Sequence, residues 1–256
     1  MDLGLADRVF VVGGGSAGLG FATASVLVEE GARVVIVGRD EQRVDAAVTK
    51  LGGGSAAGCA GDLAHPAVTA AAIKTAVSCF GRLDGALANT GGPPLSMLTT
   101  TTDDAWRQAF ESVFLAPVRL AREVGLHTRQ NHVEGAAICF VLSISVRGPL
   151  PRLTMSNGLR PGLAMLVKDL ADELGPPPSS VRITGVLPGA FATARSLSTN
   201  TQEQKEQQRA RIATIPLRRI GDPLELGRVA AFLLSPVAAY VTGTVVAVDG
   251  GACRAI

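Results

Sequence analysis

The feature that most constrains this chain is a glycine-rich turn close to its N-terminus. An apolar run, Val9 to Val12, has the composition of a buried strand and leads into the sequence GGGSAGLG at residues 13–20. The next residues, 21–30, suit a helix. Glycines let a backbone turn tightly and approach a phosphate, and a helix start offers unpaired N–H groups and a positive dipole end. The strand–turn–helix order therefore predicts an anion site, and a tight turn without a ligand is the alternative.

Two glycine spacings overlap in this turn. Gly13, Gly15 and Gly18 fit G-x-G-x-x-G, the general dinucleotide-binding pattern. Gly14, Gly18 and Gly20 fit the different spacing G-x-x-x-G-x-G. The turn alone does not choose between them, so the rest of the chain has to decide.

Length and composition indicate one α/β domain over residues 1–256, because 47% apolar residues are enough for a large core. A net charge of +2 with 18% charged residues argues against a nucleic-acid partner. The apolar runs are far shorter than the roughly 20 residues of a membrane span. The acidic N-terminus enters a strand at once and does not resemble a secretory signal. Four cysteines lack a C-x-x-C pair and indicate reduced thiols in a cytoplasmic protein without a metal site: Cys59, Cys79, Cys139 and Cys253.

Apolar runs alternate with helical stretches along almost the whole chain. Strands are expected at 8–12, 33–37, 56–60, 84–88, 136–143, 181–187 and 244–248. Helices are expected near 18–30, 40–50, 66–79, 103–130, 157–174 and 222–234. Strands that are apolar on consecutive positions are typical of a parallel sheet covered on both faces. The pattern predicts a Rossmann-type, doubly wound, seven-stranded parallel sheet flanked by helices.

One segment, residues 191–215, breaks this alternation and is polar and rich in glutamine. It follows the end of a predicted strand, where open α/β sheets bind their ligands. We interpret it as a substrate flap, with a solvated helix as the alternative.

The end of the second predicted strand indicates which cofactor the turn would bind. A carboxylate at this position accepts hydrogen bonds from the adenosine ribose and repels a 2′-phosphate, whereas an arginine attracts it. Here Gly38 ends the strand and Arg39 follows, which favours NADP(H) over NAD(H). Asp40 is interpreted as the N-cap of the next helix. Asp62 and Leu63 follow the third strand, where they meet the adenine edge or only form a turn.

With these residues in view, the chain resembles the short-chain dehydrogenase/reductase family from about residue 5 to residue 251. The glycine spacing at positions 14, 18 and 20 is the family's, although the position before it, usually Thr, is Gly13. Further matches are Asp84 to Gly91 with Asn89, Val181 to Gly189 followed by Thr193, Pro216 to Pro223, Tyr240 to Gly243, and Val248 to Gly251.

The resemblance implies a nicotinamide dinucleotide site and an assembly. The implied cofactor residues are Gly14, Ser16, Ala17, Gly18, Leu19, Gly20, Arg39, Asp62, Leu63, Asn89, Gly91, Arg160, Pro188, Gly189 and Thr193. Family members commonly form homotetramers through the long helix, the following helix and the last strand. We therefore expect a homo-oligomer, a tetramer or a dimer.

The family's catalytic residues are largely replaced in this chain. Members carry a Tyr-x-x-x-Lys pair in which the tyrosine exchanges a proton with the substrate oxygen. Counting back from Leu170 places Ser156 and Arg160 at these positions; a slipped register would put Asn157 at the lysine position. The family's strand-end serine is matched by Ser145, with Ser143 as a second choice. Val113 replaces the family's asparagine on the long helix.

These replacements leave two functions open. An alkyl hydroxyl is a poor proton donor at neutral pH, but Arg160 could stabilise negative charge on a carbonyl oxygen. The first hypothesis is an atypical NADP(H)-dependent oxidoreductase that reduces a ketone or aldehyde on a small apolar substrate, like a 3-oxoacyl reductase. The second is a non-catalytic NADP(H)-binding sensor or scaffold. Lyase or isomerase chemistry lacks an acid–base pair to support it.

Overall fold

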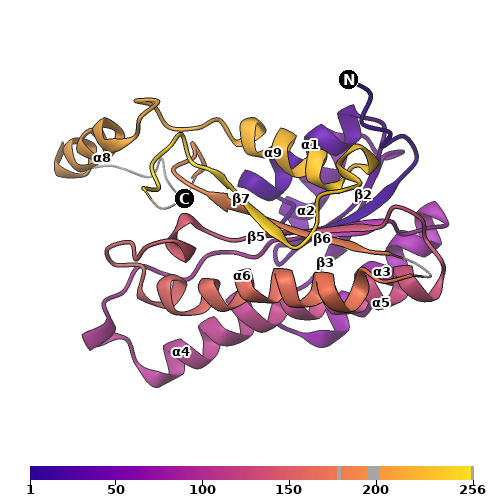
Figure 1. Cartoon of the computed structure of the whole chain (residues 1–256), viewed down its shortest axis with the longest axis horizontal. Coiled ribbons are helices and arrows are strands. Elements are labelled where there is room, and N and C mark those ends of the chain that lie inside the picture. Colours follow the sequence, from indigo (N-terminus) through magenta and orange to yellow (C-terminus); the bar gives the residue numbers. More distant parts are fainter. Residues whose placement is uncertain (178–179, 195–201, 255–256) are drawn as a thin grey trace.

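A computed structural model describes residues 1–177, 180–194 and 202–254 (Figure 1). Its centre is a seven-stranded, entirely parallel sheet with the order β3-β2-β1-β4-β5-β6-β7. The strands are β1 Val9–Gly13, β2 Arg33–Gly38, β3 Ala56–Ala60, β4 Gly85–Ala88, β5 Ala137–Val141, β6 Arg182–Pro188 and β7 Thr244–Val248. The predicted doubly wound, seven-stranded parallel fold is confirmed.

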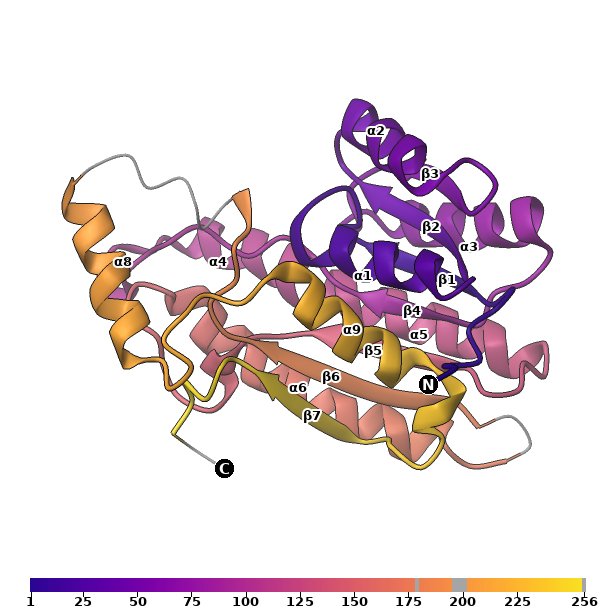
Figure 2. The same cartoon turned by 90° about the horizontal axis from the view of Figure 1, so that it is seen from above.

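Helices cover both faces of the sheet, as Figure 1 and Figure 2 show. On one face lie α1 Gly18–Glu29, α2 Glu41–Leu51 and α9 Pro223–Leu234. On the other lie α3 Pro66–Phe80, α5 Ala116–Gln130 and α6 Thr154–Leu174. Each layer packs a separate apolar cluster against the sheet, so β1, β2 and β5 are buried on both faces. This double burial explains why their sequences are apolar at consecutive positions.

Two element boundaries differ from the sequence expectation by more than one residue. The strand expected at 136–143 ends at Val141, because Ser143 accepts a hydrogen bond from the backbone N–H of Ser145 and starts a 3₁₀ turn at Ile144–Val146. The helix expected from residue 157 begins at Thr154. The connection therefore runs over residues 142–153 with Ser145 in its 3₁₀ turn, and Ser156 lies in the first turn of α6.

The long helix expected over 103–130 is present but is not uniform. It consists of α4 Asp103–Ala109, a π-helical segment Phe110–Leu115, and α5. Pro117 lacks the backbone N–H that an α-helix would direct to the carbonyl of Val113, and a local π-helical widening accommodates the missing bond.

Residues 195–201 of the predicted flap lie outside the described residues. Beyond them, α8 (Gln202–Thr214) forms a helix at the carboxyl end of the sheet. A helix here agrees with the alternative interpretation, and the flap remains a prediction. Among the described helices, none combines the length and apolar character needed to cross a bilayer.

Candidate active site

The glycine turn has the geometry that the second glycine spacing requires. Gly14 and Gly18 adopt φ angles of +55° and +57°, in the left-handed region that favours glycine. A Cβ atom on Gly20 would collide with the backbone carbonyl of Gly14. Glycine is therefore needed at positions 14, 18 and 20 together.

Asn89 holds this turn in place from the neighbouring strand. Its Nδ2 donates a hydrogen bond of 2.9 Å to the carbonyl oxygen of Gly13. On the other side, the backbone N–H of Gly15 donates to the carbonyl of Val37 at 3.1 Å. Ala17 precedes α1 and provides no side-chain cap, so the helix start keeps polar N–H groups for an anion.

A cleft of about 640 Å³ opens beside the turn. It is lined by most of the predicted cofactor residues: Gly14, Ser16, Ala17, Gly18, Leu19, Arg39, Asp62, Leu63, Asn89, Gly91 and Thr193. The remaining four lie around it. Gly20 is inside α1, Pro188 ends β6, Gly189 packs on Asp249, and Arg160 is buried in α6. The cleft has the position and the backbone donors that a dinucleotide needs, while the role of each residue stays a prediction.

The end of the cleft at β2 carries two arginines. Arg39 was predicted to lie here, whereas Arg43 was missed although it stands one helical turn later in the sequence. Asp40 caps α2 by accepting a hydrogen bond from the backbone N–H of Arg43 at 3.1 Å, which confirms the N-cap interpretation. A Cβ atom on Gly38 would lie 2.9 Å from the hydroxyl of Ser16, so a carboxylate at this strand end would displace Ser16.

Asp62 forms the turn that was one of its two predicted roles, and its contact with the adenine edge stays a prediction. Its Oδ1 accepts a hydrogen bond of 3.0 Å from the backbone N–H of Ala64, as a turn residue does. It also lines the cleft together with Leu63.

The predicted catalytic serines are adjacent in space. The hydroxyl oxygens of Ser145 and Ser156 lie 3.2 Å apart, and both residues are buried. Ser143, the second choice, uses its side chain to accept the N–H of Ser145. The geometry therefore pairs Ser156 with Ser145.

Arg160 lies one helical turn beyond Ser156 and is 7% exposed. Its Nη1 donates a hydrogen bond of 2.8 Å to the carbonyl oxygen of Val141, at the carboxyl end of β5. Asn157 instead exchanges two hydrogen bonds with the backbone of Leu150, at 2.8 and 3.1 Å. Asn157 thus fixes the loop before α6, which argues against the slipped register.

Met155, which directly precedes Ser156 in α6, lines the cleft. Among the described residues, the lining of the cleft includes Met155 but not Ser145, Ser156 or Arg160. Sequence reasoning missed Met155, because its position before Ser156 carries no motif signal.

The long helix forms another wall of the cleft. Val113 is buried, as expected of an apolar residue at the family's asparagine position, and Gln108 and Ser112 line the cleft. Trp106 packs over Gly158, where a Cβ atom would lie 2.8 Å from the indole Cη2. Sequence reasoning missed Gln108 in α4 and Ser112 in the π-helical segment, because neither position carries a motif signal.

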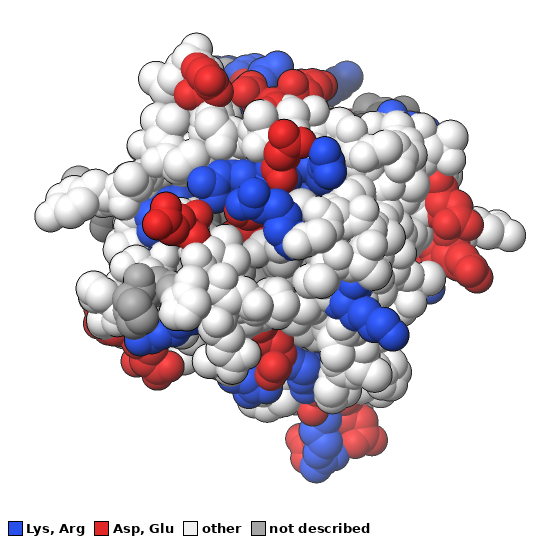
Figure 3. Space-filling view, turned by 90° about the vertical axis from the view of Figure 1, so that its right-hand side faces the viewer, with Lys and Arg blue, Asp and Glu red and all other residues white. Residues whose placement is uncertain are grey.

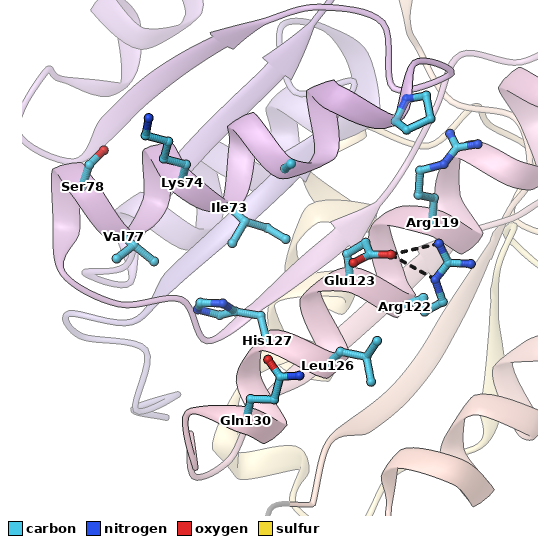
Figure 4. A pocket seen from close by; sticks show the side chains of 12 residues that line it. Ile73, Lys74, Val77, Ser78, Arg119, Arg122, Glu123, Leu126, His127 and Gln130 are labelled. Carbon is cyan, nitrogen blue, oxygen red and sulfur yellow. Dashed lines mark hydrogen bonds and ion pairs between the residues drawn. The ribbon is translucent and has the colours of Figure 1, made fainter.

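A second groove of about 880 Å³ lies between α3 and α5 (Figure 4). Arg122 pairs with Glu123 at 2.9 Å, and Arg119 donates to the backbone carbonyls of Leu63 and Ala64. None of the predicted site residues lines this groove within the described part of the chain. Among the described residues, no group of three or more His, Cys, Asp or Glu side chains is arranged to hold a metal ion.

Comparisons with known proteins give consistent results. Residues 14–253 match the family model described as enoyl-(acyl carrier protein) reductase. The chain is 32% identical to the short-chain reductase protein NovJ of Streptomyces niveus, over 96% of this chain and 94% of that protein. It is 30% identical to human dehydrogenase/reductase SDR family member 4, over 96% and 88%. A crystal structure of L-sorbose reductase from Gluconobacter frateurii with NADPH and L-sorbose matches with a TM-score of 0.91, 28% identity and full coverage of both chains.

Proposed function

This chain belongs to the short-chain dehydrogenase/reductase family of NAD(P)-dependent oxidoreductases, and from that premise we propose that it is an atypical, NADP(H)-dependent carbonyl reductase. Its substrate is a small apolar ketone or aldehyde of the kind that a 3-oxoacyl reductase accepts. The reaction proceeds without the usual Tyr/Lys proton relay. The observation that carries the proposal is the contact between the hydroxyls of Ser145 and Ser156, 3.2 Å apart, with Ser156 directly after the cleft residue Met155.

The cofactor supplies the hydride. The uncapped start of α1 and the glycine turn would hold its diphosphate, with Asn89 keeping the turn in shape. Arg39 and Arg43 would attract a 2′-phosphate, which is the reason to prefer NADP(H). NADPH is also the cofactor bound in the similar L-sorbose reductase.

The two serines would act on the carbonyl oxygen of the substrate. One hydroxyl donates a hydrogen bond to this oxygen, and the other passes a proton from water along the pair. An alkyl hydroxyl does this less well than a phenol, at a cost on the order of 10²–10⁴ in rate. Arg160 stays protonated and places positive charge near the oxygen while negative charge develops there.

The non-catalytic sensor or scaffold is the second candidate. The observation in its favour is that, among the described residues, Met155 lines the cleft whereas the buried residues Ser145, Ser156 and Arg160 do not. Such a protein would bind NADPH with the same residues and turn over no carbonyl compound.

The test is a screen of ketones and aldehydes with NADPH, comparing wild type with Ser145→Ala and Ser156→Ala. We expect slow turnover of an apolar carbonyl by wild type and a loss of about a hundredfold in either variant. Ser55→Ala, on the connection before β3, is the matched control and retains full activity. Turnover that both active-site variants retain would contradict the role of the serines.

We also propose a homo-oligomer assembled through α4–α5, α6 and β7. Large apolar side chains are exposed on two of these helices, with Met165 72% exposed on α6 and Phe110 41% exposed at the π-helical segment. Light scattering tests this proposal, and a monomeric mass would contradict it.

A further inference from the structure

Two loops at the carboxyl edge of the sheet meet beside the cleft. The loop after β4 leaves the cleft wall at Pro94, and the backbone N–H of Ser96 donates a hydrogen bond of 2.8 Å to the carbonyl of Arg152. Arg152 belongs to the loop after β5, only three residues before the cleft residue Met155. The two loops thus form one continuous rim at the mouth of the cleft.

The first of these loops exposes an unusual amount of apolar surface. Leu95, Met97 and Leu98 are 57%, 58% and 70% exposed, and they directly follow the cleft residues Pro93 and Pro94. Contiguous exposed apolar residues beside a cleft are a common sign of a binding surface. We call these three residues the apolar rim.

The charge on the rim has one sign. Residues 85–102 contain no charged side chain, and residues 135–168 contain Arg147, Arg152, Arg160 and Lys168 but no Asp or Glu. The next acids along the chain after residue 102, Asp103 and Asp104, open α4, and Asp104 is paired with Arg107. The opposite edge of the sheet differs, because basic and acidic side chains lie close together on that face (Figure 3). At the amino ends of the strands, Arg33 pairs with Asp7 and Arg8 pairs with Asp84.

Arg152 is the arginine best placed to meet a ligand. It is exposed, and its guanidinium forms no hydrogen bond or ion pair with any residue that the structure describes. Its φ of +59° is uncommon for a residue other than glycine. The hydrogen bond from Ser96 fixes this backbone beside the apolar rim.

We propose that the substrate is amphiphilic, with an apolar body that lies on the apolar rim and an anionic group, a carboxylate or a phosphate, that binds Arg152. A guanidinium recognises both groups with paired hydrogen bonds. The inference rests on the proposed reductase function and adds an anionic group to the apolar carbonyl substrate. A neutral ketone of equal length is then a poorer ligand than its anionic counterpart.

The experiment uses a matched pair of ligands, 7-oxooctanoate and its methyl ester, which differ in charge and share the same ketone. Their binding to the NADPH-loaded protein is measured by calorimetry, and NADPH oxidation is followed in the same samples. For wild type we expect roughly fivefold tighter binding of the carboxylate. Arg152→Asn removes this preference, and asparagine tolerates the left-handed backbone.

Arg218→Asn is the matched control, because Arg218 is also exposed and has a φ of +55° in the connection between α8 and α9. We expect Arg218→Asn to keep the preference for the carboxylate over the ester. We expect the same of Arg152→Lys, which retains the positive charge and so separates loss of charge from a folding defect in Arg152→Asn. Leu98→Ser weakens both ligands equally. Equal binding of the two ligands to wild type, or an unchanged preference in Arg152→Asn, would overturn the anion site even where the ketones are reduced. Binding that depends on Arg152 without any NADPH oxidation would support the anion site and overturn the reductase function.

Discussion

The two ends of the cleft are built in different ways. At the glycine turn the important groups belong to the backbone, and close contacts require glycine at positions 14, 18 and 20. At the end that we propose for the carbonyl, called the carbonyl end, the proposed groups are the side chains of Ser145, Ser156 and Arg160. A backbone site tolerates few substitutions without losing its shape, whereas a side-chain site changes chemistry by substitution while the fold stays intact. Under this proposal, the difference explains how a chain keeps the family's cofactor turn without its proton relay.

The largest effect is expected at the backbone end. In Gly20→Ala the new methyl group collides with the carbonyl of Gly14, so NADPH binding weakens roughly tenfold to hundredfold. Fluorescence titration measures this loss, and circular dichroism checks the fold. Gly53→Ala is the control, because no atom lies within 4 Å of a Cβ placed there. Equal NADPH affinity in both variants would show that the turn does not hold the cofactor.

At the carbonyl end, Arg160→Met should lower stability as well as activity. The substitution leaves the buried carbonyl of Val141 without its donor, at a cost of about 2 kcal/mol. The melting temperature should fall by roughly 4–8 °C, as measured by calorimetry. Arg160→Lys should recover part of the loss. An unchanged melting temperature in Arg160→Met would show that the hydrogen bond from Arg160 to Val141 does not stabilise the fold.

The two arginines at the end of β2 are expected to set the preference for NADPH over NADH. We expect the double variant Arg39→Ala/Arg43→Ala to weaken NADPH binding about tenfold and to leave NADH binding almost unchanged, because only NADPH has a 2′-phosphate. Arg33→Ala, at the opposite edge, is the control. A parallel loss for both nucleotides would mean that the arginines act on the shared part of the cofactor.

Thiol reactivity gives the smallest effect and reports on β5, the strand that leads to the carbonyl end. Burial raises the pKa of Cys139 to about 12, so its thiol stays protonated, and thus unreactive, at pH 8. Cys79 is exposed. A thiol reagent should therefore modify Cys79 in the native protein and leave Cys139 free, as mass spectrometry would show. Fast modification of Cys139 would indicate that this strand opens.

The sequence was sufficient for the parallel sheet and the glycine turn, because apolar runs and glycine spacings are local signals. It also named Ser156, by counting back from Leu170, and Ser145, by the resemblance to the family; their hydroxyls lie 3.2 Å apart, and their catalytic roles stay a prediction. Met155 and Ser112 could not be predicted as wall residues. Met155 belongs to no motif. Ser112 lies in the π-helical segment before Pro117, which the sequence analysis did not predict.

The contact between Ser96 and Arg152 was also out of reach of the sequence. These residues lie far apart in the chain, and their two loops join through backbone pairing of Ser96 with Arg152 and Leu153. Arg43 is a different case, because its position one turn after Arg39 was visible and was overlooked.

The most direct test of the proposed reductase function is the transfer of deuterium from 4-deuterated NADPH to an apolar ketone, followed by mass spectrometry of the alcohol. We predict a deuterium-labelled alcohol with wild type and about a hundredfold less labelled alcohol with Ser145→Ala or Ser156→Ala, while all three proteins bind NADPH equally. If wild type binds NADPH tightly and labels no alcohol from any ketone or aldehyde tested, the reductase function is contradicted and the non-catalytic sensor or scaffold takes its place.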